Sequence, residues 1–290
     1  MNAARSSILA LTRQGRLRLF GTTELLHLPP PQWLVDDILP AGGLVGLYGP
    51  PGTGKSFLAI DLALAVSSGQ TWHGHSLRPG FVLYVSAEGG TGIGKRVQAW
   101  LSHFQVSPAE TNIGWLTESI AMMSPSEDID VLLERLNIEI EQQPVLVVID
   151  TMARCFEGGD ENLQQDMSRF ITSVDRLRRE CRAAVVVVHH TRRDADRERG
   201  STAFRGAADT MIQTTRERQG PVVISCNKQK DASEFAEMSM ELRVIPVTML
   251  GDHTHTSCVL VDEAISRNEA ILAELAKGPQ TFSALRCHLS

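Results

Sequence analysis

Residues 49–56 (GPPGTGKS) have the types and spacing of a loop that binds a nucleoside triphosphate. Glycines let backbone N–H groups wrap around phosphates, and a helix starting at the end of the loop adds a favourable partial charge. Lys55 can reach the β- and γ-phosphates, and Ser56 can hold Mg²⁺. A glycine turn of purely structural use is the alternative. The expected contact residues are Gly49, Pro50, Pro51, Gly52, Thr53, Gly54, Lys55, Ser56 and Phe57.

Two acids follow apolar runs that are typical of buried strands. Asp150 ends VLVVID, where a carboxylate can bind Mg²⁺ through water at the carboxyl edge of a parallel sheet. Its neighbour is Thr151 rather than a second acid, so the group that orients an attacking water must lie elsewhere. Glu88, in FVLYVSAEGG, is the candidate, because glycines follow it and free it to face the same edge. A solvated loop acid is the alternative.

A third apolar run, AAVVVVHH, ends in His189 and His190. A polar residue at this edge can sense the γ-phosphate and pass the signal to the following loop, and we assign that role to His190. Ordinary packing is the alternative for a histidine.

The loop after these histidines, residues 191–200 (TRRDADRERG), concentrates basic side chains on a chain of formal net charge -6. Such a patch can grip the phosphates of single-stranded DNA, which the overall charge would repel. Interleaved acids leave a mixed-charge solvated surface as the alternative. The expected DNA-binding residues are Arg192, Arg193, Arg197 and Arg199.

From Gly42 onward, short apolar runs alternate with helical patterns, which predicts an α/β fold with a doubly wound, mainly parallel sheet flanked by helices. Apolar residues recur at helical spacing over residues 129–140 and 163–177. After about residue 210, apolar runs follow one another without helices, which indicates an antiparallel C-terminal extension. We expect a lead-in at 1–30, the core at 31–262 and a short helical segment at 263–290, which is either an incomplete winged helix or a cap.

Composition sets the broad class of this 290-residue, 42% hydrophobic chain. The sequence contains no apolar run long enough to span a membrane and no signal-peptide pattern, which predicts a soluble cytoplasmic protein without a membrane partner. The five cysteines are scattered, without the spacing of a zinc site or a disulfide framework. The pairs His73/His75 and His253/His255 lack further ligands nearby and are expected in turns.

Residues 49–56, Glu88, VLVVID, VVVVHH and residues 199–210 (RGSTAFRGAADT) together resemble the RecA-like core of hexameric replicative helicases. The resemblance is chiefly to the plasmid and phage RepA type, an AAA_25-like P-loop ATPase, and more loosely to the DnaB type. It covers roughly residues 30–245 and implies that Glu88 activates water. It also implies that Lys228 and Lys230, in NKQKD, reach a neighbouring subunit's γ-phosphate, although lysine replaces the arginine usual at the second position.

The resemblance implies a single-stranded-DNA-dependent helicase or translocase that uses ATP and Mg²⁺ and assembles as a homo-oligomer, a hexameric ring. It would move 5′ to 3′ in the replication of a plasmid, phage or similar element, with a separate primase or replication initiator as partner. Two alternatives stay open. One is a RecA/RadA-like recombination or repair ATPase, and the other is a KaiC-like regulatory switch without unwinding activity.

Overall fold

The computed structural model of the chain describes residues 20–88, 90, 92–123, 125–138, 140, 142–191, 202–248, 254–263, 268 and 272. Two compact units are distinguished, Met1–Gln32 and Trp33–Ser290. The first contains α2 (Thr22–Leu26), and the elements below belong to the second. The C-terminal helical segment expected at 263–290 lies almost wholly outside the described residues, so the boundaries expected at residues 30 and 262 stay a prediction.

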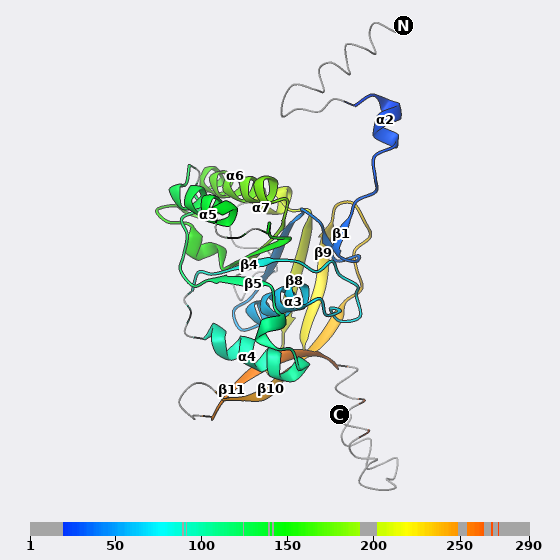
Figure 1. The fold of residues 1–290 in the computed structure, drawn as a ribbon, viewed down its shortest axis with the longest axis vertical. Helices are drawn as coiled ribbons and strands as arrows, with labels where there is room; N and C mark the ends of the chain where they lie inside the picture. The colour runs from blue at the N-terminus through cyan, green and yellow to red at the C-terminus, as the bar shows by residue number, and fades with distance from the viewer. Residues whose placement is uncertain are drawn as a thin grey trace, which may run out of the picture. The chain divides into compact units, whose positions relative to one another are not determined.

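A nine-stranded sheet in the order β11-β10-β9-β8-β3-β7-β6-β4-β5 forms the centre of the second unit (Figure 1). The strands from β8 to β5 in this order pair in parallel, whereas β8, β9, β10 and β11 pair antiparallel in succession. The mainly parallel sheet with an antiparallel C-terminal extension is therefore confirmed. The strands are β3 (Leu44–Gly49), β4 (Val82–Ser86), β5 (Ile113–Leu116), β6 (Leu146–Asp150), β7 (Ala184–His190), β8 (Thr210–Arg216), β9 (Val222–Gln229), β10 (Met238–Thr248) and β11 (Thr254–Asp262).

Helices cover both faces of this sheet, as Figure 1 shows. Successive side chains of a strand point to opposite faces of the sheet. In β6, Leu146 and Val148 pack in one buried cluster, and Val147 and Ile149 pack in the other. The first cluster includes α3 (Lys55–Ser68) and α4 (Ile93–Phe104). The second includes α5 (Glu127–Ile138), α6 (Gln164–Cys181) and Phe204 of α7 (Thr202–Ala207). Shorter elements are β1 (Trp33–Val35), β2 (Leu39–Pro40), η1 (Pro108–Glu110) and η2 (Met152–Cys155).

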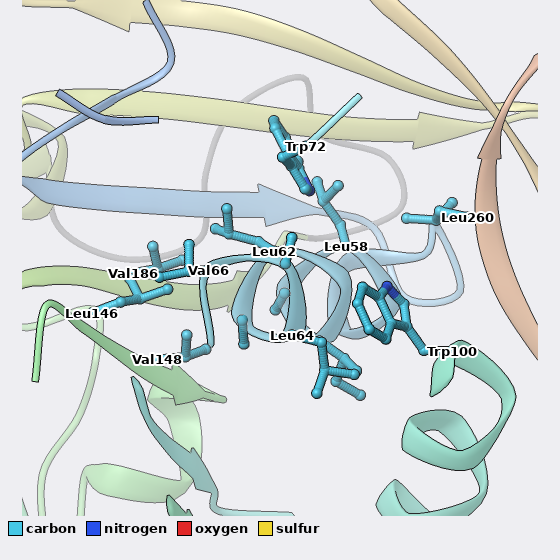
Figure 2. Packing of buried hydrophobic residues seen from close by; sticks show 14 of the residues in the cluster. Leu58, Leu62, Leu64, Val66, Trp72, Trp100, Leu146, Val148, Val186 and Leu260 are labelled. Atoms are coloured by element: carbon cyan, nitrogen blue, oxygen red, sulfur yellow. The ribbon is translucent and has the colours of Figure 1, made fainter. Parts of the chain in front are cut away.

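The helix α3 is buried on nearly every side. A surface helix would instead bury only one apolar face. Its side chain Val66 lies near Val186 of the sheet, as Figure 2 shows, and both belong to the same buried cluster. On its other side it contacts α4 and β11, and α4 in turn contacts β10 and β11. The antiparallel extension therefore covers the helix that follows the phosphate loop.

One carboxylate is buried within this helical layer. Asp61 of α3 is 3% exposed and accepts hydrogen bonds from the indole N–H groups of Trp72 (2.7 Å) and Trp100 (2.8 Å). Its Oδ2 lies 2.8 Å from Nε2 of His73. Burial acts to lower the pKa of His73, but the charge and hydrogen bond of Asp61, with the charge of Asp262, raise it above its usual value. Because a buried charge requires such partners, the cluster ties α3 to α4 and to the turn that contains His73.

No helix among the described residues is both long enough and apolar enough to cross a membrane.

Candidate active site

The phosphate-loop segment joins the end of β3 to the start of α3. Gly52 and Gly54 have φ angles of +83° and +89°, a left-handed region that residues with a side chain rarely adopt. At Gly49 a Cβ atom would lie 2.2 Å from the carbonyl oxygen of Thr214. The hydroxyl of Thr53 lies 2.8 Å from the hydroxyl of Thr214. The loop therefore rests on β8, and glycine is required both for its turns and for this close approach.

Lys55 is 3% exposed at the start of α3. Its ammonium donates to the carbonyl oxygens of Gly49 at 2.9 Å and Pro50 at 2.7 Å. Burial lowers the pKa of Lys55 to about 8, and the negative charges of Asp150 and Glu88 oppose that shift. A cation held in this way beneath a glycine-rich loop is positioned to meet a polyphosphate anion.

Asp150 ends β6 and is buried between two hydroxyl donors. Ser56 donates to its Oδ1 at 3.2 Å, and Tyr84 of β4 donates to its Oδ2 at 2.7 Å. Burial raises the pKa of Asp150 above its usual value, while the two hydrogen bonds oppose that shift. Carboxylate and hydroxyl oxygens suit Mg²⁺, which is commonly held by one or two side chains together with phosphate oxygens. The residues present therefore fit the expected metal.

Glu88 follows β4 at the same edge of the sheet, with its side chain 53% exposed. Thr151 donates its hydroxyl to Oε1 of Glu88 at 3.2 Å, and Nε2 of His190 lies 3.8 Å from the same oxygen. Burial and the positive charge of Lys55 lower the pKa of His190, although Glu88 and Asp150 oppose the shift. The structure thus places Glu88, His190 and the threonine after Asp150 at one end of adjacent parallel strands.

The two histidines at the end of β7 face opposite sides of the sheet, as successive strand residues must. Nδ1 of His189, which is 3% exposed, lies 3.9 Å from a carboxylate oxygen of Glu161, in the loop before α6. His190 lies instead on the side of Glu88. The sequence treats the two histidines as one polar pair, but the structure gives them separate surroundings.

Three residues around the site were not identified from the sequence. Tyr84 looks like one more apolar member of a buried strand, yet its hydroxyl bonds to Asp150. Thr214 supports the phosphate loop from β8. Arg96 of α4 places its guanidinium 4.9 Å from the ring centroid of Phe57, the last of the expected nucleotide-binding residues. The feature of the sequence that could have pointed to Arg96 is its place as a basic residue in the helix that follows Glu88.

The two candidate trans-acting lysines differ in their surroundings. Lys228 in β9 donates its ammonium to backbone carbonyl oxygens at the end of α7. Lys230 has a side chain that is 62% exposed, and its ammonium lies 3.6 Å from Asp209. The expected DNA-binding residues Arg192, Arg193, Arg197 and Arg199 lie outside the described residues.

Comparison with known proteins agrees with this geometry. Residues 18–196 match the model of the AAA_25 family, described as an AAA domain, and the match spans more than half of the 290-residue chain. The chain belongs to this family. The resemblance to RecA-like P-loop ATPases is thereby confirmed, whereas the roles of the individual site residues stay a prediction.

Two solved structures are similar to this AAA_25 member. The ATPase domain of G40P aligns with a TM-score of 0.52 and 16% identity, covering 69% of this chain and 81% of that chain. The RadB recombinase aligns with a TM-score of 0.51 and 18% identity, covering 70% of this chain and 88% of that chain. At these identities the likeness concerns the fold, which is RecA-like as expected.

Proposed function

We propose that this chain is an ATP-hydrolysing, single-stranded-DNA-dependent hexameric helicase or translocase that acts in replication of a plasmid, phage or similar element. The observation that carries the proposal is the 3.8 Å approach of His190 to Glu88. His190 is the last residue of β7, and residues 191–200, which we call the arginine loop, follow it directly in the sequence. A residue that senses the phosphate site therefore stands next in sequence to the basic residues assigned to DNA.

Each residue of the site has a role in hydrolysis. Lys55 and the loop N–H groups bind and orient the phosphates. Ser56 and Asp150 would hold Mg²⁺, which would supply positive charge against the negative charge that develops on the phosphates. Glu88 accepts a proton from the attacking water. Thr151 fixes the orientation of Glu88 through its hydrogen bond to Oε1.

Hydrolysis depends on assembly because one subunit supplies a cation to the active site of the next. Such a cation stabilises transition-state charge when the neighbour is seated, which couples hydrolysis to the ring. The side chain of Lys230, which is 62% exposed, supports this assignment. Priming would be supplied by a separate primase or replication initiator.

A RecA/RadA-like recombination or repair ATPase is the second candidate, supported by the fold shared with the RadB recombinase. A KaiC-like switch is the third. Unwinding of a forked duplex separates the motor from both, and negative-stain images separate rings from filaments.

The first experiment compares ATP hydrolysis with and without single-stranded DNA in the wild type and in Arg192→Ala/Arg193→Ala. We expect DNA to stimulate the wild type, and the ratio of stimulated to basal rate to fall to about one in the double variant, because its phosphate contacts are lost. The matched control, Arg135→Ala/Arg179→Ala, removes the same charge from exposed positions on α5 and α6 and keeps the stimulation. If DNA does not alter the wild-type rate, the motor proposal is wrong and a nucleotide-timed switch is favoured.

The lowered pKa of Lys55 predicts a pH dependence. Because phosphate binding requires the ammonium, kcat/KM for ATP should fall as the pH rises above about 8, the pKa of Lys55. Initial rates from pH 7 to 9.5, with circular dichroism at each pH to verify folding, measure the effect. In Lys55→Arg the guanidinium stays charged over this range, so any residual activity should not show the decline. A wild-type profile that stays level would contradict the assignment.

A further inference from the structure

The end of α7 and the end of β9 are joined by reciprocal hydrogen bonds. The ammonium of Lys228 donates to the carbonyl oxygens of Arg205 at 2.7 Å, Gly206 at 3.3 Å and Ala208 at 2.5 Å. In return, the guanidinium of Arg205 donates to the carbonyl oxygen of Asn227 at 2.8 Å. We call this set of contacts the α7 latch.

The chemistry of the α7 latch suits its place in the fold. The last carbonyls of a helix have no partner within the helix and carry a negative partial charge, which a lysine ammonium satisfies. An ammonium has three donors, and three carbonyls of the same chain accept from Lys228. Reaching a neighbouring subunit would require Lys228 to give up these bonds, whereas Lys230 has a side chain that is 62% exposed.

The α7 latch lies at the C-terminal end of α7, and the arginine loop precedes the N-terminal end of the same helix in sequence. That loop leaves β7 after His190, which approaches Glu88, and it ends where α7 begins at Thr202. A further contact of α7 is in the core, where Phe204 is 2% exposed and its ring centroid lies 6.4 Å from that of Phe170 of α6. The latch thus fixes the C-terminal end of the short helix that follows the loop in sequence, and β7, which ends in His190 beside Glu88, precedes the loop.

We propose that Lys228 is a positioning residue, which fixes α7 within its own subunit, and that Lys230 is the cation that acts across the subunit interface. This inference rests on the proposed function for the role of Lys230. The contact of Lys228 stands independently of it. Lys228 acts on hydrolysis through α7 and not by direct contact with the nucleotide.

Hydrogen exchange in the full-length protein without nucleotide tests the first half. In Lys228→Gln the amides of residues 202–208 should exchange about tenfold faster than in the wild type, because the carbonyl oxygens at the end of α7 lose the ammonium that holds them. Lys228→Arg, which keeps a cation, should restore part of the protection, and Lys230→Gln should match the wild type. Thermal unfolding of each variant shows whether the whole protein has been destabilised. Wild-type exchange in a folded Lys228→Gln would overturn the latch.

Mixed assemblies test the second half. When Lys230→Gln is mixed with the P-loop variant Lys55→Ala, about a quarter of randomly formed interfaces combine an intact Lys55 with a neighbour's intact Lys230, and activity should reappear. The mixture of Lys228→Gln with Lys55→Ala should show no such recovery, because Lys228 acts within its own subunit. Recovery in the second mixture would overturn the proposal. If wild-type hydrolysis does not depend on assembly, the proposed function fails, yet the exchange measurement still decides the role of Lys228.

Discussion

Lys55→Ala is expected to lower kcat/KM for ATP hydrolysis about 10³-fold, a loss typical of removing a charged group that stabilises the transition state in a buried site. Lys55 is buried beneath the loop, and its ammonium is already directed at the loop carbonyls of Gly49 and Pro50. Alanine leaves the loop backbone without the cation that offsets the charge of the β- and γ-phosphates. Both nucleotide affinity and turnover should therefore fall.

Steady-state hydrolysis and equilibrium binding of a fluorescent ATP analogue measure the two effects separately. Unfolding curves serve as the control, because replacing a buried side chain can also alter stability. A folded Lys55→Ala that binds and hydrolyses ATP as the wild type does would show that residues 49–56 form a structural turn.

Glu88→Gln is expected to lower kcat about 10²- to 10⁴-fold with little change in ATP affinity. Glutamine keeps the shape of the side chain and can still accept from Thr151, but an amide does not accept a proton from water. The loss should therefore fall on the chemical step, and a single-turnover experiment should show bound ATP that persists.

Glu118→Gln provides the matched control. Glu118 is another exposed acid, and it lies just after β5, the strand that neighbours β4 at this edge of the sheet. We expect its replacement to leave turnover unchanged. If Glu88→Gln behaves like Glu118→Gln, then Glu88 is a solvated loop acid and the general base must be sought elsewhere.

Much of the architecture is predictable because it is encoded locally. Apolar runs such as LVGLYG and VLVVID are bounded by glycines or acids, and each became a strand of the sheet. The helices predicted over residues 129–140 and 163–177 correspond to α5 and α6. The strand β5 was missed, because its four residues lie half-buried at an edge of the sheet and include Gly114, so no strong apolar run marks it.

The sequence by itself determined the alternation of strands and helices, and it predicted the phosphate loop, the acid that follows β4 and the acid that ends β6. Each of these depends on residues that are close in the chain, where backbone geometry and side-chain period fix what is near what.

Only the tertiary structure decided which distant groups support the site. Thr53 and Thr214 are 161 residues apart and meet because β8 lies beside β3 in the sheet. Likewise, Tyr84 reaches Asp150 because β4 pairs with β6, and the ammonium of Lys228 bonds to the end of α7 rather than lying exposed as Lys230 does. The order of strands in the sheet creates these neighbours, and the apolar pattern of a single strand does not specify which strand will lie beside it.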